Sequence, residues 1–283
     1  MSVLDREEYI EQAYFFRTLR DRLAEGQATQ SVLERIDQEI LSTTRLPMAI
    51  QFLAAELKHS GLLSSGFARL GHYFSPYQAF IVRGSEDETR RFSADQALLV
   101  LEREAEYRAG KVSQAGLFIY QFEVISRNRL GYTEGLQAMA GDPYYDADWR
   151  AFFEMVRQQL GSVDFADLLF ARSHLYVTEQ RRFDPGYEPP VPPLFGEKEG
   201  KIARANAGRD PLYLFAALQR QLGYPEVPRP KPREDTGVRL ETLQLKIRDL
   251  ELRIKLLEAE QRGTLDLSKL VNPDLLRDQD DKW

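Results

Sequence analysis

Segments with apolar residues at helical spacing follow one another along most of this chain. The first covers residues 4–25, and Gly26 is suited to the left-handed conformation in which a helix often ends. Its residues at helical spacing are Ile10, Ala13, Tyr14, Arg17 and Leu19. Alternation of apolar and polar residues is nearly absent, and only residues 78–83 have the character of a strand. The pattern therefore predicts an all-α fold.

Several helix starts carry residues that suit a first turn. In the first 110 residues these are Ser31 with Glu34, Pro47, Pro76, and Ser93 with Gln96. The last pair opens a strongly periodic helix over residues 94–109, with Gly110 as its end. Further helices are predicted over residues 113–129, 133–140, 148–160 and 165–176, and from Pro211 to a stop at Gly223.

Two proline-rich runs, residues 185–193 and 225–232, interrupt the helices. The second is polar, and it predicts a stiff linker over residues 224–236. The first is suited to packing on the body through its apolar neighbours, which are Tyr187, Val191, Leu194 and Phe195. PxxP patterns occur in both runs, but we favour a spacer or a packed loop over a recruited ligand.

A heptad pattern follows the linker, over residues 237–262. Its apolar steps alternate three and four residues through Leu240, Leu243, Ile247, Leu250, Ile254 and Leu257. Mostly β-branched a positions with Leu at d favour a parallel dimer. Opposite charges at g and e support the same pairing, and they belong to Lys246, Glu251, Arg253 and Glu258. We expect a homodimer. Three alternatives remain: a trimer, a coiled coil with a partner protein, and packing of this helix on the body through a second apolar face, formed by Leu245, Leu252 and Leu256.

Composition excludes several classes of function. The chain has 43% hydrophobic and 29% charged residues, which is typical of a globular protein. It has no cysteine, which excludes disulfides and thiolate metal sites and is compatible with a cytoplasmic location. The sequence contains no run of about 18 apolar residues, so it predicts no membrane span. The first residues do not resemble a signal peptide. The net charge of −6 opposes binding to nucleic acid.

No Walker loop, GxGxxG, GxSxG or HExxH motif occurs in the sequence. Of the three histidines, only His59 belongs to an ExxH pair, with Glu56, and a di-iron bundle would need two such pairs. We interpret Glu56 and His59 as neighbours on a helix surface. We therefore expect no metal, no cofactor and no enzymatic activity.

The sequence contains two acidic clusters, and we interpret neither of them as a metal site. The first, Glu102, Glu104 and Glu106, spreads round a predicted helix and is expected to be a solvated face. The second, Asp142, Asp146 and Asp148, is explained by helix capping. An enzyme would need a site assembled from residues distant in sequence, such as Arg127, Arg181, Glu104 and Tyr132.

Four stretches of the first half follow an order that is typical of one family. They are YFFRTLRDRLAEG, SVLERIDQEI, FSPYQAFIVRGSE and the helix over residues 95–108. In this order and spacing the first half resembles the F-type domain of bacterial type II secretion and type IV pilus platform proteins, which is a helical bundle. The resemblance implies that Gly84 and Glu86 lie at a turn that sets a connection between helices.

A degenerate second copy resembles the same domain from Gly116 onward. FIYQFEVISRNRLGYTEGLQAM is similar to its opening, and PPLFGEKEGKI places Gly196, Glu197 and Gly200 at the turn before a helix over residues 209–222. The resemblance implies tandem F-domain-like bundles over residues 1–111 and 112–223. The linker, the coiled coil and a flexible acidic tail over residues 263–283 complete the expected organisation.

Members of this family place membrane helices after each domain, and this sequence shows none. The resemblance therefore implies a scaffold rather than a membrane platform, because the family's cytoplasmic domains contact the assembly ATPase and other components without catalysis. We expect a non-catalytic protein-protein interaction adaptor or assembly factor of a secretion or pilus-type machine, which oligomerises through its coiled coil. The alternatives are a solo helical module that binds a peptide or ligand, and an enzyme without a recognisable motif.

Overall fold

The computed structural model describes residues 3–229, 244–251 and 253–254. By its contacts the chain divides into two units, Met1–Pro230 and Lys231–Trp283. Within the described residues there is no β-sheet, and the only strand-like pairings are two isolated bridges, Leu160 with Val163 and Ser173 with Phe195. The predicted all-α class is confirmed.

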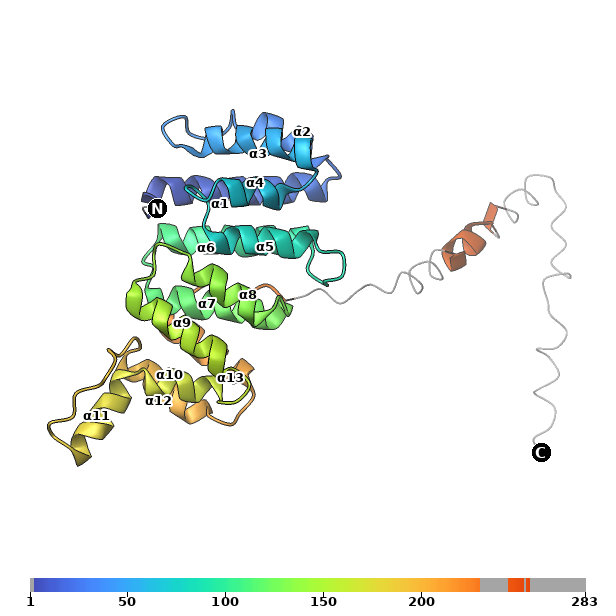
Figure 1. Ribbon diagram of the computed structural model, residues 1–283. Coiled ribbons are helices and arrows are strands. Elements are labelled where there is room, and N and C mark those ends of the chain that lie inside the picture. Colours follow the sequence, from blue (N-terminus) through green and yellow to red (C-terminus); the bar gives the residue numbers. More distant parts are fainter. Residues whose placement is uncertain (1–2, 230–243, 252, 255–283) are drawn as a thin grey trace, which may run out of the picture. The chain divides into compact units, whose positions relative to one another are not determined.

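Helices α1 to α13 belong to the first unit (Figure 1). The first six are α1 (Arg6–Ala24), α2 (Thr29–Ile36), α3 (Leu46–Ser60), α4 (Leu63–Arg69), α5 (Pro76–Glu86) and α6 (Ala94–Ala109). The others are α7 (Gln114–Asn128), α8 (Tyr132–Ala140), α9 (Ala147–Gln159), α10 (Phe165–Ala171), α11 (His174–Phe183), α12 (Glu197–Asn206) and α13 (Pro211–Leu222). In the second unit, residues 244–251 and 253–254 are helical.

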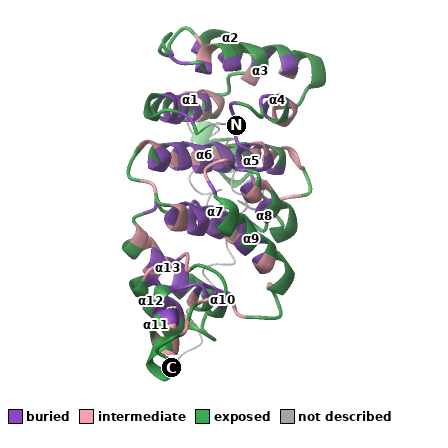
Figure 2. Cartoon of the chain, turned by 60° about the vertical axis from the view of Figure 1, so that its left-hand side comes forward, coloured by how far each residue is buried: buried purple, intermediate pink, exposed green. Residues whose placement is uncertain are grey.

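The helices of the first unit lie in successive layers (Figure 1). At one end α2 packs on α3, and the next layers hold α1 with α4, α6 with α5, and α7 with α8. Helix α9 packs on α8, and α10 to α13 form the other end, where α13 returns to α7. Buried residues line the surfaces between the layers, and exposed residues cover the outside (Figure 2). Each layer is therefore stabilised by burial against its neighbours.

Helix α1 packs antiparallel along α6. The Arg6 Nε group donates to the Ala109 carbonyl at 2.9 Å, and Arg17 pairs with Glu102 at 2.6 Å. The buried face of α1 includes Phe15, Phe16 and Leu19, each 0% exposed. Three of the five residues that the helical spacing singled out are on the outside, because Ile10 is 41% and Tyr14 is 40% exposed and Arg17 is exposed too. The predicted helix is confirmed, but its predicted apolar face was partly wrong.

Helix α7 is the central helix of the second half. Its residues from Gly116 to Ile125 are all buried, as is typical of a helix that is apolar on every side. The Phe118 ring lies within 6.1 Å, centroid to centroid, of six aromatic side chains, among them Trp149, Phe152, Phe153 and Phe195. These contacts join α7 to α9 and to the segment after α11.

Several predicted helix boundaries are confirmed. Proline occupies the first turn of α3, α5 and α13. The capping box of Ser93 with Gln96 is present at the start of α6. Gly26, Gly161 and Gly223 each have a positive φ just after a helix, a conformation that glycine adopts without strain. Local sequence therefore determines these ends.

Three local predictions were wrong. Residues 78–83 are not strand-like but helical, because Ser75 and Pro76 start α5 directly before them. Ser31 does not cap a helix, since α2 begins at Thr29 with Ser31 in its first turn. Residues 165–176 form two helices, because α10 ends before Arg172 and the Ser173 hydroxyl caps α11.

Of the three glutamates predicted to form a solvated face of α6, Glu106 is exposed, whereas Glu102 and Glu104 are buried. Glu102 is 6% and Glu104 is 0% exposed. Both have cationic partners, since Arg17 and Arg20 of α1 pair with Glu102, and Arg108 pairs with Glu104. The prediction failed because the partners of Glu102 come from a helix that is distant in sequence.

Residues next to the two proline-rich runs are buried. After the first run Phe195 is 1% exposed, and the Leu194 and Phe195 amides donate to the Arg172 carbonyl. Tyr224, just before the second run, and Val227, near its start, are buried too. Residues 224–229 therefore pack on the body instead of beginning a linker; the boundary between the two units falls after them.

The predicted boundary between residues 111 and 112 lies inside the first compact unit. Buried apolar residues on both sides of it belong to one hydrophobic cluster. The contacts mark one body here, and they do not separate two bundles.

Candidate protein-binding groove

Helix α4 is short, and its N-terminus is capped by a residue of another helix. The Glu86 carboxylate, at the end of α5, accepts hydrogen bonds from the Leu63 amide at 2.5 Å and the Ser64 amide at 3.2 Å. A carboxylate at this end of a helix satisfies free N–H groups and favours the helix dipole. Glu86 therefore fixes the start of α4 beside the end of α5.

The start of α5 is fixed by its own residues. The Ser75 hydroxyl accepts from the Gln78 amide at 3.2 Å, and the Gln78 side chain accepts from the Ser75 amide at 3.0 Å. The rings of Phe67 and Phe74 stack next to this start, with centroids 4.1 Å apart. Together these contacts form a rigid aromatic corner between α4 and α5.

Helix α8 lies on the other side of α5. It packs closely on α7 because Gly135 has no side chain, and a Cβ there would lie 3.0 Å from the Ile125 Cγ1 atom. An ion pair joins it to α5, between the Arg83 Nη2 and Glu134 Oε2 atoms at 3.2 Å.

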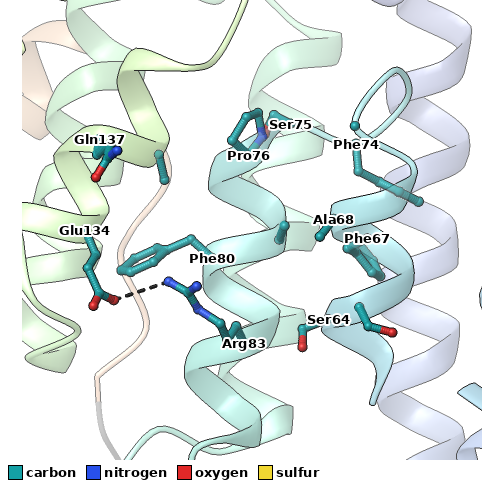
Figure 3. A pocket seen from close by; sticks show the side chains of 14 residues that line it. Ser64, Phe67, Ala68, Phe74, Ser75, Pro76, Phe80, Arg83, Glu134 and Gln137 are labelled. Atoms are coloured by element: carbon teal, nitrogen blue, oxygen red, sulfur yellow. Dashed lines mark hydrogen bonds and ion pairs between the residues drawn. The ribbon is translucent and has the colours of Figure 1, made fainter. Parts of the chain in front are cut away.

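A groove of about 710 Å³ lies between α4, α5 and α8 (Figure 3). Its walls include Phe67 and Ala68 of α4, Ala79 and Phe80 of α5, and Ala138 of α8. At one place Arg83 and Glu134 reach toward each other from opposite walls (Figure 3). Three alanines among the lining residues allow a ligand to approach the helix backbones.

Few charged side chains line the groove. Its one cation and one anion, Arg83 and Glu134, neutralise each other. Two of its serines have structural partners, since Ser75 caps α5 and the Ser65 hydroxyl donates to Glu56 at 2.9 Å. No histidine lines it, so the most common general base is absent from its walls.

A buried ionic cluster lies elsewhere in the core. The Glu104 carboxylate accepts from Arg108 at 2.7 Å and from Gln121 at 2.9 Å, and Arg108 also pairs with Asp142. Burial raises the pKa of Glu104, although Arg108 acts in the opposite direction. The adjoining cavity measures only about 10 Å³, which is at most the space of one water molecule. We therefore assign the cluster to the core rather than to a ligand site.

The predicted oligomerisation residues lie only partly within the described chain. Ile247, Leu250 and Ile254 belong to helical segments and are 54%, 55% and 55% exposed. Lys246 and Glu251 are exposed too, and Arg253 pairs with Asp249 one turn away at 3.2 Å. The remaining members of the two sets lie outside the described residues, and they are Leu240, Leu243, Leu257 and Glu258.

Four of the five residues of the family turn motif lie within helices, and the fifth, Gly196, is an N-cap. Gly84 and Glu86 are within the last turn of α5. Gly196 is the N-cap of α12, and Glu197 and Gly200 lie in its first turns. The predicted turn geometry is corrected on this point, but Glu86 does connect two helices through its bonds to the start of α4.

The other singled-out residues do not converge on a site. Glu56 is 7% exposed and pairs with Arg69 at 2.7 Å, so it is not on the surface as predicted. The four residues named for an enzyme each have a separate contact: Arg127 pairs with Glu123, Arg181 donates to the Tyr187 carbonyl, Glu104 pairs with Arg108, and Tyr132 donates to Ser126. In the described part of the chain, no group of three or more metal-ligating side chains is arranged to hold a metal.

Among the helices that the structure describes, none has both the length and the apolar character to cross a bilayer. No protein-family model, curated protein or solved structure matches this chain. The described residues form an all-helical fold.

The groove was not predicted from the sequence. Its residues come from three helices, and α4, with the residues that follow it, lies in a stretch without strong periodicity. The one available signal was Glu86, which the family resemblance singled out for a helix connection. Its carboxylate positions α4, and α4 forms one wall of the groove.

Proposed function

We propose that this protein is a non-catalytic adaptor that binds an apolar helix face of a partner protein in the groove between α4, α5 and α8. The observation that carries the proposal is the groove itself, which is lined by Phe67, Ala79, Phe80 and Ala138 and measures about 710 Å³. Cavities of roughly 300–1,000 Å³ with mainly apolar walls are typical of binding sites.

The lining favours an uncharged apolar ligand. Because Arg83 and Glu134 are paired with each other, a charged ligand would gain little net attraction from the walls. The groove is bounded by α4, α5 and α8. An amphipathic helix binds in such a groove through apolar side chains that are spaced by three or four residues. Large apolar side chains of a partner helix would contact the accessible alanines of the walls, Ala68, Ala79 and Ala138.

The second part of the proposal is that two copies act together. Residues 244–251 are helical, and the apolar side chains of Ile247 and Leu250 on the predicted heptad seam are more than half exposed in the single chain. Pairing of this seam between two chains would bury these side chains. A dimer would present two grooves to a multivalent partner, which raises the apparent affinity without new contacts.

Site-specific photocrosslinking tests the groove. A photoreactive amino acid is placed at Gln137 in the groove or at Lys201, an exposed position on α12, in the full-length chain. We expect a specific protein to be crosslinked from position 137 only, and the crosslink to map to an amphipathic helix of that protein. Equal crosslinking from both positions, or a crosslink outside any apolar segment, would contradict the proposal.

A solo binding module is the second candidate. It is favoured by the fact that all groove residues lie within the first unit, Met1–Pro230. Comparison of the full-length protein with a chain ending after Thr236 separates the two. A solo module would keep its full apparent affinity for a surface-bound partner, whereas the divalent adaptor would lose part of it.

A further inference from the structure

Arg172 is a buried cation without a partner for its side chain. It follows the last residue of α10 and is 6% exposed. Its Nε and Nη2 atoms are buried and have no hydrogen-bond partner among the described residues. Its backbone has a clear structural role, since its carbonyl accepts from the amides of Leu194 and Phe195. The structure therefore explains the position of its main chain but not the charge of its side chain.

The surroundings of this guanidinium do not neutralise it. The Phe152 ring lies beneath it, with the Arg172 Cζ atom 5.6 Å from the ring centroid. Asp148 attracts it, but among the described residues no carboxylate lies within ion-pair distance. Burial lowers the pKa of Arg172, yet an arginine stays charged in a protein. A buried charge without a counter-charge is costly, and a bound anion would offset that cost.

Arg172 lines a cavity of about 240 Å³. The walls come from α9, α10, α11 and the first proline-rich run, and they are largely apolar, with Met155, Leu168, Val177 and Pro190 among them. Tyr176 and Tyr187 add hydroxyl groups, but no Asp or Glu lines the cavity. The site thus combines one cation with an apolar enclosure.

We propose that this cavity binds a small monocarboxylate with an apolar body, whose carboxylate pairs with Arg172. Because the Nε and Nη2 atoms have almost no accessible surface, the carboxylate would pair with the Nη1 group of the guanidinium in a charge-assisted hydrogen bond. A single cation lines the cavity, which suits one negative charge and is poorly suited to a phosphate dianion. The volume is below the range of roughly 300–1,000 Å³ for drug-sized ligands, so a small molecule is favoured.

Calorimetric titration of the full-length protein tests the proposal. The probes are 3-methylbutanoate, 3-phenylpropionate and indole-3-acetate, each compared with its neutral primary amide. We expect at least one acid to bind about ten-fold or more tightly than its amide, because a bond to a charged group is lost in the amide. If none of the acids binds, or if acid and amide bind equally, the proposal is wrong.

Variants locate the binding. Arg172→Met should reduce the affinity for the acid to that for the amide, and Ala171→Phe, at an exposed residue of the cavity wall, should abolish binding of both. Arg209→Met, at an exposed arginine outside the cavity lining, is the matched control and should bind as the wild type does. If Arg172→Met does not fold, the binding site is tested by the affinity of Ala171→Phe for the acid, together with the comparison of acid and amide in the wild type. Unchanged binding of the acid to Ala171→Phe would place the ligand elsewhere and overturn the assignment.

Discussion

The Arg108 guanidinium pairs with the Asp142 carboxylate inside the core, where their side chains are 4% and 2% exposed. Arg108 belongs to α6, and Asp142 precedes α9. The pair therefore crosses the boundary at residues 111 and 112 that the sequence predicted between two bundles. Through Glu104, which also pairs with Arg108, it joins both halves in one polar network of the core.

Replacing Arg108 should destabilise the whole first unit. Arg108→Met leaves the Glu104 and Asp142 carboxylates buried without their cation, and breaking a buried pair in this way costs about 3–5 kcal/mol of unfolding free energy. Urea unfolding followed by circular dichroism and by tryptophan fluorescence should show a lowered midpoint with coincident transitions. Arg157→Met, at an exposed ion pair of α9, is the control and should leave the midpoint unchanged. Separate transitions for the two probes would show that the halves unfold independently.

The raised pKa of Glu104 predicts a pH dependence of stability. Burial raises this pKa in the folded state. At a pH between the unfolded and the folded pKa, the Glu104 carboxyl therefore holds a proton in the folded protein that it has released in the unfolded chain. Stability should consequently fall as the pH rises from the unfolded pKa of about 4.3 through the raised folded value. Comparison of Glu104→Gln with the wild type, by urea unfolding over this pH range, isolates the contribution of this carboxyl. An identical pH slope in the two proteins would contradict the assignment.

Two glycines of the family motif should respond oppositely to alanine. At Gly200 a Cβ would lie 2.8 Å from the Cβ atoms of Ser173 and Leu175, and such overpacking costs about 1–3 kcal/mol. At Gly84 the nearest contacts are at 3.5 Å and 3.6 Å, so alanine fits and should stabilise the helix by roughly 0.5–1 kcal/mol. Thermal unfolding of Gly200→Ala and Gly84→Ala measures both. Equal effects of the two substitutions would mean that the approach of α12 to the start of α11 is not tight.

The heptad seam predicts that dimerisation depends on Ile247 and Leu250. Replacing both with Asp places charges on the seam and should give a monomer. The mass of the full-length protein, measured by light scattering, should therefore halve. The control is Lys246→Ala, which removes one predicted charge pair and should leave the dimer in place, because exposed ion pairs contribute little. An unchanged mass of the Asp variant would exclude this seam as the interface.

Local signals in the sequence predicted where the helices lie along the chain, but not which helices pack against one another. Pro76 and the pair of Ser93 with Gln96 start helices as expected, because capping and the first turn depend on adjacent residues. Glu102 was misassigned to a solvated face, since its partner Arg17 comes from a helix far away in the sequence. Secondary structure was thus accessible from the sequence, whereas burial of charge depends on tertiary contacts.

The candidate groove could not be predicted for the same reason. Phe67, Phe80 and Ala138 come from three helices, and no spacing along the chain relates them. Arg172 gave no signal either, because it lay within the predicted helix over residues 165–176, and arginines are mostly exposed. Its burial follows from the proline-rich run that packs over the end of α10 through bonds to its carbonyl.

The most direct test of the account is the affinity of the full-length protein for the partner captured by crosslinking at Gln137. This partner is immobilised at low and at high surface density, and three proteins are compared with the wild type. Ala79→Trp fills the groove, Ala151→Trp alters an exposed position of α9, and the third carries Asp at positions 247 and 250. We expect Ala79→Trp to lose binding at both densities, Ala151→Trp to bind normally, and the third protein to be weakened only at high density. Normal binding by Ala79→Trp would mean that the groove is not the recognition site.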